Sequence, residues 1–454
     1  MQLNPARRQF VKAAAAAIAT ARFPILGAND KVNVGIVGVG GRGTDHVRGY
    51  LANDPGARVA AICDVNQEAR ERAVAFVRKE KSYAPKEFAD MRRMFESKDV
   101  DAVSVATPNH WHALTTIWAC QAGKDVYVEK PASHNIYESG QMVKAARKYN
   151  RMVQVGSQSR SIPYIMRAME VLHGGAIGTV YHARGLCFRR RFSIGHTPDE
   201  QVPPGLDWDL FLGPAQWKPY SKNKYLYNWH WFWDTGNGDI GNQGAHQMDI
   251  CLWGLNRTDW PVTVSSTGGK FAWKDDQETP NTLQTALVFS DAQLTFDVRN
   301  LPTPPEGLSD MERPEYTGNI FFGDKGFMIV DHKGFKVFKS AAASIAGEAG
   351  RGSGAGGQEK YEKVMDEKPS EEDDTAAHMK NFLDGIRARD HRKLHADIEI
   401  GARAAAFCHL ANIGYRAGHS LRMNPSTVRF VQADDANALL TRDYRKPYVV
   451  PENV

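Results

Sequence analysis

A glycine-rich turn is the first segment whose residue types could do chemistry. The turn has the sequence Gly38-Val39-Gly40-Gly41-Arg42-Gly43, and it lies between a short apolar run and a helical segment. There the first glycine of a GxGxxG pattern allows a tight turn, the second lets backbone approach a pyrophosphate, and the third lets helix pack on strand. The helix N-terminus would face the pyrophosphate. The turn predicts a dinucleotide site, and a simple tight turn is the alternative.

A carboxylate at the end of the next apolar run indicates which dinucleotide to expect. Asp64 ends the segment Ala61-Ile62-Cys63-Asp64. A carboxylate at this position accepts hydrogen bonds from both ribose hydroxyls of NAD and repels the 2′-phosphate of NADP. The sequence therefore favours NAD as the cofactor and leaves NADP possible.

Polar residues at the ends of two further apolar runs extend the candidate site. Thr107-Pro108-Asn109-His110-Trp111-His112 follows one run, and Glu129-Lys130-Pro131 follows another. The carboxyl ends of strands in an open α/β sheet face the ligand crevice. A lysine at that edge can contact both the cofactor and a substrate oxygen, although a surface lysine is the alternative for Lys130. The residues expected to contact the cofactor are therefore Gly38, Gly40, Gly41, Arg42, Gly43, Asp64, Thr107, Pro108, Asn109, His112, Glu129 and Lys130.

The segments that must position these residues indicate an α/β fold in two parts. Up to about residue 157, short apolar runs alternate with helical segments of about 10–15 residues, which predicts βαβ units and a doubly wound parallel sheet. Beyond about residue 160, strand-like runs joined by short turns predict an open, largely antiparallel sheet. These runs are Val180–Phe188, Val262–Gly268, Thr282–Phe289, Ala292–Arg299, Gly318–Gly323 and Gly326–Asp331, and helical periodicity returns over Thr375–Arg389 and Ile398–Arg416.

The order and spacing of these motifs resemble the Gfo/Idh/MocA family of sugar and polyol dehydrogenases. The resemblance covers roughly residues 31–335 and extends to the helix over Thr375–Arg389. It implies a Rossmann domain, followed by an open sheet whose face holds a carbohydrate substrate over the nicotinamide. It also implies a homo-oligomer, either a dimer or a tetramer.

In that family the lysine works with an Asp-x-x-x-His pair farther along the chain. The matching segment places His246 in register as the general base, but the aspartate position holds Asn242. An amide can hydrogen-bond a substrate hydroxyl, yet it cannot carry negative charge. Asp239 and Asp249 are the candidates for the missing carboxylate, seven residues before and three after the histidine.

Alcohol oxidation suits these residue types. The reaction moves a hydride to the nicotinamide and removes the hydroxyl proton, and a neutral histidine is a suitable base near pH 7. A nearby ammonium stabilises the developing alkoxide. We therefore expect His246 to be the base and Lys130 its electrostatic partner and proton relay, with Asn242 as the third catalytic residue.

An aromatic stretch just before this segment is the candidate sugar-binding surface. Residues 225–233 contain six aromatic rings besides His230. Sugars pack their apolar C–H faces on aromatic rings and need polar partners for their hydroxyls. We expect His230 and Trp231 to contact the substrate, together with Asp239 and Asp249, and a core or subunit interface is the alternative for the rings.

The composition excludes several classes of function. The net charge of +5 is small for 454 residues and the basic residues are dispersed, so nucleic-acid binding is not indicated. The densest basic patch, Arg189 to Arg191, predicts a surface arm or subunit contact, with contact to an anionic substrate as the alternative. The five cysteines are far apart and form no CxxC pair, so neither a metal site nor a disulfide framework is expected.

The N-terminus resembles a twin-arginine export signal. Arg7-Arg8-Gln9-Phe10-Val11-Lys12 precedes a weakly apolar run from Ala13 to Ala21, which is too short to span a bilayer. We expect a periplasmic or otherwise exported protein without stable membrane insertion. A cytosolic N-terminus with chance arginines is the alternative.

Export restricts the reaction, because NAD is a cytosolic metabolite and twin-arginine export carries folded proteins. The enzyme would carry its cofactor with it and would need a second substrate to reoxidise it. Alternatively, transient oxidation would drive a redox-neutral glycoside cleavage by elimination, hydration and reduction. A nucleotide-binding protein without turnover is the third possibility, and Asn242 is its main support.

The expected organisation has four parts. They are a signal peptide (1–28), a Rossmann domain (31–157), a substrate-binding and oligomerisation domain (158–424) and a tail (425–454). Residues 341–375 begin Ala/Gly-rich and end acidic, which predicts a mobile surface insertion. The proline-containing tail is expected to clasp a neighbouring domain or subunit.

Overall fold

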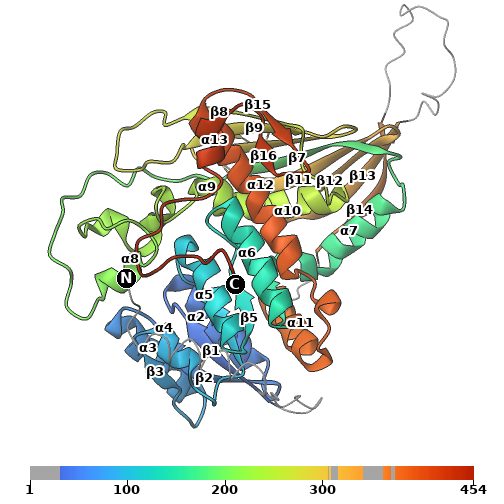
Figure 1. Cartoon of the computed structure of the whole chain (residues 1–454). Helices are drawn as coiled ribbons and strands as arrows, with labels where there is room; N and C mark the ends of the chain where they lie inside the picture. Colours follow the sequence, from blue (N-terminus) through green and yellow to red (C-terminus); the bar gives the residue numbers. More distant parts are fainter. Residues whose placement is uncertain (1–30, 305, 308–314, 341–360, 370–373) are drawn as a thin grey trace, which may run out of the picture.

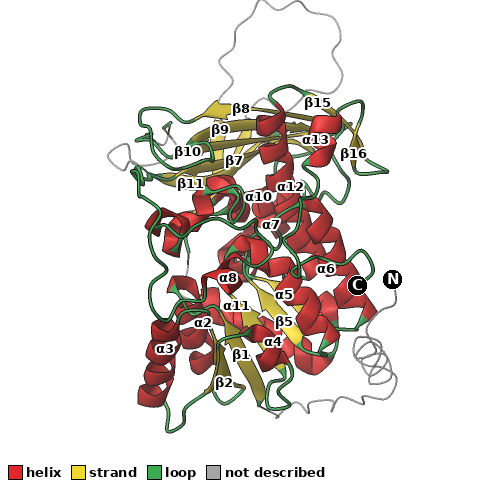
Figure 2. Cartoon of the chain, turned by 60° about the vertical axis from the view of Figure 1, so that its left-hand side comes forward, coloured by secondary structure: helices red, strands yellow, loops and turns green. Residues whose placement is uncertain are grey.

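The chain folds around two β-sheets, one above the other, with helices between them (Figures 1 and 2). The computed structural model describes residues 31–304, 306–307, 315–340, 361–369 and 374–454. The predicted signal peptide lies outside these residues. Within them, no helix combines the length and apolarity needed to cross a membrane.

The first sheet has six parallel strands in the order β3-β2-β1-β4-β5-β6. The central strands are buried along almost their whole length, as expected for a parallel sheet covered on both faces. The strand order reverses between β1 and β4, which opens a crevice at their carboxyl ends. The strands are β1 (Val32–Val37), β2 (Ala57–Cys63), β3 (Lys86–Phe88), β4 (Ala102–Val105), β5 (Asp125–Val128) and β6 (Val153–Val155).

Helices connect these strands and cover the sheet. The asparagines before α3 and α6 cap them, because the side chain of Asn66 accepts from Ala69 N and that of Asn135 accepts from Glu138 N. The last long helices return from the far end of the sequence, so that Phe382 of α11 packs in the same core cluster as Val34 of β1. The helices are α2 (Gly41–Ala52), α3 (Gln67–Glu80), α4 (Met91–Phe95), α5 (Asn109–Gln121), α6 (Ile136–Lys148) and α11 (Asp374–Ala388).

The second sheet has ten strands, and every pairing in it is antiparallel except that between β7 and β10. Its helices lie on one face, toward the first sheet (Figure 1). The strands are β7 (Val180–Phe188), β8 (Thr263–Gly269), β9 (Thr282–Val288), β10 (Gln293–Arg299), β11 (Tyr316–Gly323), β12 (Gly326–Asp331), β13 (Gly334–Ser340), β14 (Tyr361–Glu367), β15 (Leu421–Asn424) and β16 (Arg429–Phe430). The two sheets confirm the predicted fold class.

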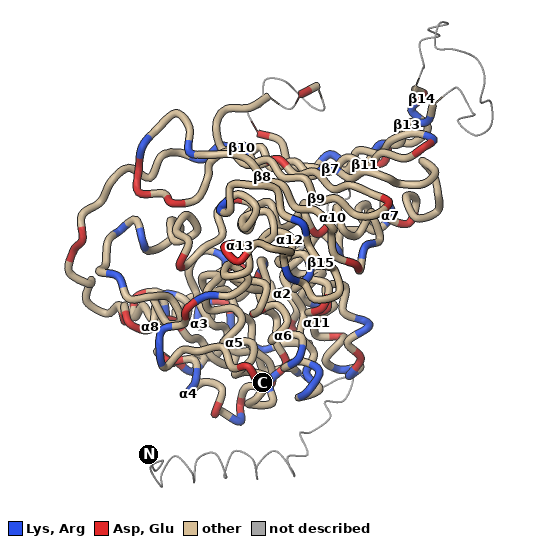
Figure 3. Tube along the Cα trace, turned by 45° about the horizontal axis from the view of Figure 1, so that its top comes forward, with Lys and Arg blue, Asp and Glu red and all other residues tan. Residues whose placement is uncertain are grey.

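The remaining helices surround the junction between the sheets. The long ones are α7 (Pro163–His173), α10 (Gly244–Gly254) and α12 (Ile398–Ala417), and the short ones are α8 (Trp208–Leu212), α9 (Gly238–Gly241) and α13 (Asp434–Ala438). The 3₁₀ turns are η1 (Gln158–Ser161), η2 (Lys222–Lys224), η3 (Leu226–Trp231) and η4 (His391–Lys393). Basic and acidic residues are interspersed over both halves of the trace (Figure 3).

Part of the predicted mobile surface insertion, residues 341–375, lies outside the described residues, namely 341–360 and 370–373. Residues 361–367 instead form β14, an edge strand paired with β13. Its sequence, Tyr-Glu-Lys-Val-Met-Asp-Glu, is mostly charged and its side chains are exposed. Charged side chains suit an edge strand, because they discourage pairing with another chain, but they weaken the strand pattern in the sequence.

The C-terminal tail, residues 425–454, packs against the dinucleotide-binding half of the chain. The Tyr444 hydroxyl donates to Glu138 Oε1 at 3.1 Å, and Tyr448 packs in the core cluster of β4 and α5. Arg442 donates to Asp234 O at 2.7 Å, which ties the same tail to the second half. The predicted clasp therefore acts within one chain, across the two halves.

Three buried histidines at the junction should make the fold sensitive to acid. Burial lowers the pKa of His110 and His378 to about 4 and that of His409 to about 3, from 6.5. The neutral rings stabilise the fold above pH 6.5, and this stability is lost as the pH falls toward 4. We expect the free energy of unfolding to fall by up to about 1.4 kcal/mol per pH unit for each ring, measured by urea unfolding between pH 7.5 and 4.5.

A matched pair of variants separates this effect from general acid denaturation. His409→Gln should flatten the pH dependence, whereas His332→Gln, at an exposed position, should leave it unchanged. An unfolding free energy that stays constant from pH 7 to 4.5 would contradict the prediction.

Candidate active site

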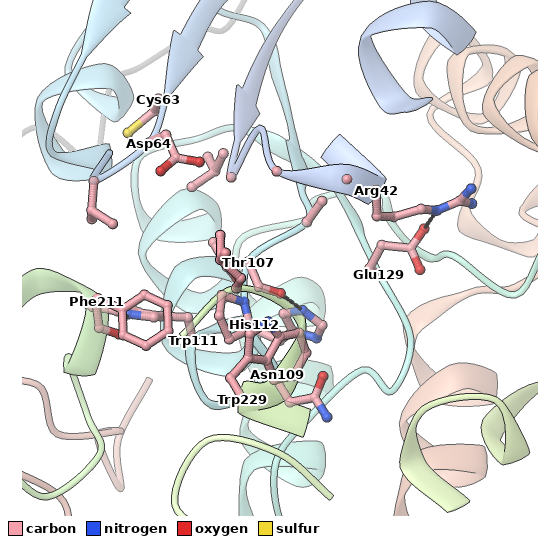
Figure 4. Close-up of a pocket in the computed structure, with 18 of the residues that line it drawn as sticks. Arg42, Cys63, Asp64, Thr107, Asn109, Trp111, His112, Glu129, Phe211 and Trp229 are labelled. Carbon is pink, nitrogen blue, oxygen red and sulfur yellow. Dashed lines mark hydrogen bonds and ion pairs between the residues drawn. The ribbon is translucent and has the colours of Figure 1, made fainter. Parts of the chain in front are cut away.

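A cavity of about 600 Å³ opens at the carboxyl ends of the first sheet, where the two halves meet. Eleven of the twelve residues expected to contact the cofactor line it, and they lie in the segments that follow β1, β2, β4 and β5. They are Gly38, Gly40, Gly41, Arg42, Asp64, Thr107, Pro108, Asn109, His112, Glu129 and Lys130. The second half contributes aromatic and polar residues, including Phe211 and Trp229 (Figure 4) as well as Tyr225, Tyr227, His230 and Asn242.

The glycine turn has the shape that a pyrophosphate requires. Gly38 has φ +80°, and a Cβ on Gly43 would lie 1.8 Å from Gly38 O, so both positions need glycine for the fold itself. A Cβ on Gly40 or Gly41 would meet no protein atom within 4 Å. Their open side faces the cavity at the start of α2, which has no side-chain cap. The backbone therefore fits an anionic group at this helix N-terminus.

Asp64 is oriented toward the cavity by backbone groups. Its Oδ2 accepts from Val39 N at 2.7 Å, and its Oδ1 accepts from Asn66 N at 2.9 Å. Each carboxylate oxygen keeps a further lone pair for a ligand hydroxyl. Burial raises the pKa of Asp64, and the two backbone hydrogen bonds oppose that shift.

Glu129 binds the neighbouring parts of the site together. Its Oε1 accepts from Arg42 Nε at 2.8 Å (Figure 4) and lies 2.9 Å from His46 Nε2, while its Oε2 accepts from Lys130 N at 3.1 Å. Burial alone would raise the pKa of Glu129, but the Arg42 guanidinium holds it well below its usual range. Glu129 is therefore a fixed anion and does not exchange protons near pH 7.

Lys130 projects from the same loop toward the second half. Its Nζ donates to Asn242 O at 3.0 Å, and burial lowers the pKa of its ammonium. His112 supports the loop, since its Nδ1 lies 2.7 Å from Pro131 O and its Nε2 lies 2.8 Å from Thr107 O (Figure 4). The lysine therefore reaches the segment that contains Asn242.

His246 lies on α10, one turn beyond Asn242. Its ring makes no hydrogen bond with the described residues and is half-buried, next to the residues that line the cavity rather than among them. Burial, reinforced by the Lys130 ammonium, lowers the pKa of His246 to about 3. The ring is therefore neutral at pH 7 and can accept a proton.

Neither candidate for the missing carboxylate is free to contact a substrate. Asp239 is buried, and its carboxylate accepts from Arg191 Nη2 at 2.7 Å and Nε at 3.1 Å. Asp249 accepts from Arg160 Nε at 2.7 Å and Nη2 at 2.9 Å, and it lines a separate, smaller cavity. The structure thus corrects the expectation that one of them replaces the carboxylate at position 242.

The aromatic stretch divides between the cavity and the core. His230 lines the cavity, and its Nδ1 lies 2.5 Å from Tyr227 O, while burial lowers its pKa to about 3. Trp231 is only 3% exposed and does not line the cavity, because its ring packs near the Arg191 guanidinium. Tyr227 and Trp229 line it instead, although sequence reasoning had singled out only their neighbours. The 3₁₀ geometry of η3 decides which rings face inward, and the sequence carries no clear signal for it.

Of the basic patch, one arginine is half-buried in an ion pair and the others are exposed. Arg191 pairs with Asp239, Arg189 Nη1 donates to Gln243 Oε1 at 2.8 Å, and Arg190 lies over the Phe192 ring. The positive charge of Arg189 contributes to the lowered pKa of His246, after burial, Lys130 and Arg42.

Two family models match the chain. One, described as the oxidoreductase family with an NAD-binding Rossmann fold, matches residues 32–157. The other, the C-terminal alpha/beta domain of the same oxidoreductase family, matches residues 177–291 and 341–450.

Curated relatives carry glycosidase names. A glycosyl hydrolase family 109 protein of Saccharopolyspora erythraea is 30% identical over 245 residues, which cover 53% of this chain and 48% of that protein. An alpha-N-acetylgalactosaminidase of Shewanella oneidensis is 23% identical over 326 residues, covering 67% of this chain and 65% of that protein. The chain thus spans about half to two thirds of the length of these relatives.

Solved structures with the same fold carry oxidoreductase names. Levoglucosan dehydrogenase in complex with NADH and levoglucosan has a TM-score of 0.63 at 17% identity, covering 87% of this chain and 99% of that one. Aldose-aldose oxidoreductase from Caulobacter crescentus, complexed with glycerol, has a TM-score of 0.61 at 18% identity, covering 87% and 100%. These structures share the fold of this chain, and the two family models identify it as a member of the Gfo/Idh/MocA oxidoreductase family with an NAD-binding Rossmann domain.

Proposed function

We propose that this chain is an NAD-dependent oxidoreductase that oxidises a ring CH–OH group of a sugar, polyol or glycoside. One observation carries the proposal: a single cavity joins the glycine turn and Asp64 to Lys130, His230 and the segment of Asn242. A dinucleotide held along the first half would bring its reactive end to the polar and aromatic residues of the second.

The residues of the first half fit NAD better than NADP. The open face of Gly40 and Gly41 at the start of α2 accommodates the pyrophosphate, and Asp64 accepts from the ribose hydroxyls. A 2′-phosphate at the same position would meet the Asp64 carboxylate. When bound, NAD supplies the hydride acceptor for alcohol oxidation.

Residues of this chain accept the hydroxyl proton and stabilise the negative charge that develops on the substrate oxygen. The neutral His246 ring accepts the hydroxyl proton, and the Lys130 ammonium stabilises the oxygen as it becomes an alkoxide. Trp229 and His230 offer a ring face and a polar ring to the sugar at the same wall of the cavity. The backbone carbonyl of Asn242 accepts a hydrogen bond from the Lys130 ammonium, and the amide side chain adds no negative charge.

A second candidate is redox-neutral glycoside cleavage, and the glycosidase names of the curated relatives favour it. A hydroxyl would be oxidised to a ketone, the neighbouring C–H would lose its proton, and the glycosidic substituent would leave. Water would then add, and the stored hydride would return to the ketone. The same residues serve both routes, and a nucleotide-binding role without turnover has less support because Lys130 and His246 are retained.

We also propose that the chain is exported with its cofactor bound and forms a homo-oligomer. The twin-arginine motif at residues 7–12 supports export, and family resemblance supports the oligomer. An exported enzyme has no cytosolic NAD pool, so it needs either a second sugar that reoxidises the cofactor or the redox-neutral route.

Product analysis tests the proposed reaction. The purified protein is incubated in D₂O with a panel of aldoses, polyols and methyl glycosides, and both nucleotide reduction and sugar products are measured. A ketone or lactone supports the dehydrogenase, and a deuterium-labelled free sugar without net redox supports the glycosidase. Lys130→Met and His246→Ala should each lower kcat/KM about 10²- to 10³-fold, while Lys144→Met on the surface of α6 should not. Turnover of no compound would contradict both routes.

Two glycine variants test where the cofactor lies. Gly40→Ala adds a methyl group where no protein atom lies within 4 Å, so the unfolding free energy should change little while NAD binding weakens about tenfold or more. Gly43→Ala forces a Cβ against Gly38 O, so it should destabilise the protein without any ligand, by about 1–3 kcal/mol. Nucleotide titration and urea unfolding measure the two effects. Unchanged NAD affinity in Gly40→Ala would place the pyrophosphate elsewhere.

Replacement of Asp64 tests the choice of dinucleotide. Asp64→Ala removes the acceptor for the ribose hydroxyls, so NAD should bind about 10- to 100-fold more weakly, whereas NADP should bind equally well or better. Calorimetric titration of both nucleotides into wild type and variant gives the ratio. Tighter binding of NADP than of NAD by the wild type would overturn the assignment.

A further inference from the structure

The Tyr227 hydroxyl lies next to Asn242, at the position where the family pattern has a carboxylate. Asn242 Nδ2 donates to the Tyr227 hydroxyl at 2.8 Å, and both residues line the large cavity with Lys130. The tyrosine is 51% exposed, so a ligand in the cavity can reach it. In this chain, position 242 therefore holds an amide in place of the family carboxylate, and that amide is hydrogen-bonded to the hydroxyl of Tyr227.

The direction of this hydrogen bond is fixed by a buried ion pair. Asn242 Nδ2 also donates to Asp239 Oδ1 at 3.2 Å. Asp239 is fully buried and paired with Arg191, so it is an anion that can only accept. The amide nitrogen, rather than the amide oxygen, must therefore face Asp239, and the same nitrogen reaches the phenol.

The phenol oxygen consequently accepts a hydrogen bond from Asn242, which leaves the O–H group to act as a donor. Among the residues that the structure describes, none accepts that proton. A phenol that accepts one hydrogen bond is a better donor through its O–H, because hydrogen bonds in a chain polarise one another. Arg191, Asp239, Asn242 and Tyr227 thus form a chain whose last donor points to whatever occupies the cavity.

The backbone and the neighbouring rings hold the phenol in place. Leu226, the residue before it, has φ +48°, a left-handed conformation that is costly for a side chain of this kind and is typical of functional sites. The Tyr227 ring lies 4.5 Å from the His230 ring and 5.7 Å from the Arg191 guanidinium. The ring is therefore packed on one side while its hydroxyl borders the cavity.

We propose that Tyr227 binds the substrate, donating its hydroxyl proton to a sugar oxygen beside Lys130. Asn242 is then a positioning residue that acts through the tyrosine. The inference rests on the proposed function, because it requires that a hydroxylated ligand enters this cavity.

One consequence distinguishes this arrangement from a simple loss of the family carboxylate. Asn242→Asp would place a second carboxylate next to Asp239 and would turn the Tyr227 proton toward the new acceptor. The substitution that restores the family pattern should therefore lower activity in this chain rather than raise it.

The test compares two tyrosines of equal exposure, one inside the cavity and one outside it. Tyr227→Phe removes only the hydroxyl, and Tyr181→Phe makes the same change on β7, at a tyrosine that is also 51% exposed but does not line the cavity. The probes are a panel of aldoses and methyl glycosides, with binding followed by saturation-transfer NMR and turnover by nucleotide reduction and product formation. Tyr227→Phe should weaken sugar binding or kcat/KM about tenfold or more while NAD affinity stays unchanged. Tyr181→Phe should leave the response to sugar intact.

A double-variant cycle tests the link to Asn242. Asn242→Asp should lower kcat/KM by a similar factor, and the double variant Asn242→Asp/Tyr227→Phe should be no worse than either single variant. NAD affinity and thermal unfolding of each variant show whether it is folded, and Tyr227→Phe, at an exposed position, provides the test if Asn242→Asp does not fold.

The outcomes separate this inference from the proposed function. A wild type that turns over a sugar, with Tyr227→Phe behaving identically, overturns the role of Tyr227 alone. An Asn242→Asp variant that is more active than wild type also overturns it. A wild type that binds NAD but neither binds nor converts any sugar overturns the proposed function and this inference together.

Discussion

Glu129 is the buried anion on which the assembly of the dinucleotide-binding half depends. The carboxylate is only 4% exposed, and it bonds to Arg42 at the start of α2, to His46 one turn later and to the backbone of Lys130. A Cβ on Gly156, the residue that follows β6, would lie 2.8 Å from Glu129 Oε1. One side chain therefore sets the spacing of the glycine turn, the lysine loop and the segment that leads to the second half. A buried carboxylate is tolerable only with such partners, because loss of one partner of a buried pair costs about 3–5 kcal/mol.

The same constraint decides which charges remain for a ligand. Glu129 is committed to Arg42, Asp239 to Arg191, and Asp249 to Arg160. The three pairs leave the Lys130 ammonium with a backbone carbonyl as its hydrogen-bond acceptor. The cavity thus offers one positive group that lacks a direct anionic partner among the described residues. In the proposed reaction that charge is available to the substrate oxygen.

Local features were sufficient to predict the first half of the chain. The cofactor contacts could be predicted from short-range geometry alone. They are glycines between a strand and a helix, a carboxylate at the end of β2, and polar residues at the ends of β4 and β5. All of the residues predicted to contact the cofactor except Gly43 line the cavity. Gly43 instead packs against Gly38, which is the structural role of the third glycine in such a turn. The parallel and antiparallel sheets followed from periodicity, but four strands of the second sheet, β13 to β16, were not among the predicted runs. In the edge strand β14 most side chains are exposed and charged, which hides the strand pattern.

The second half of the site depends on contacts that sequence spacing does not reveal. Asp239 and Asp249 were candidates because they lie near His246 in sequence, but their arginine partners are 48 and 89 residues away. Those ion pairs remove both carboxylates from the list of free groups. Tyr227 could not be identified from sequence spacing for a related reason. Its hydroxyl is oriented by the Asn242 amide, and the orientation of that amide is set by Asp239. Residue type alone therefore identified the segment but could not rank the side chains within it.

The lowered pKa of His246 is compatible with a role as base because of the ammonium that helps to lower it. Burial is the main cause of the shift to about 3, and Lys130 is the next. A weak base can deprotonate an alcohol only if the alkoxide is stabilised at the same time. The Lys130 charge that disfavours a protonated imidazole also stabilises the alkoxide oxygen, so the pKa of the substrate hydroxyl and the pKa of the histidine fall together. With a carboxylate at position 242, the ammonium would be partly neutralised, which would strengthen the base and weaken the stabilisation of the alkoxide. In the proposed reaction, the asparagine instead leaves the positive charge to the substrate oxygen, and its amide donates a hydrogen bond to the Tyr227 hydroxyl.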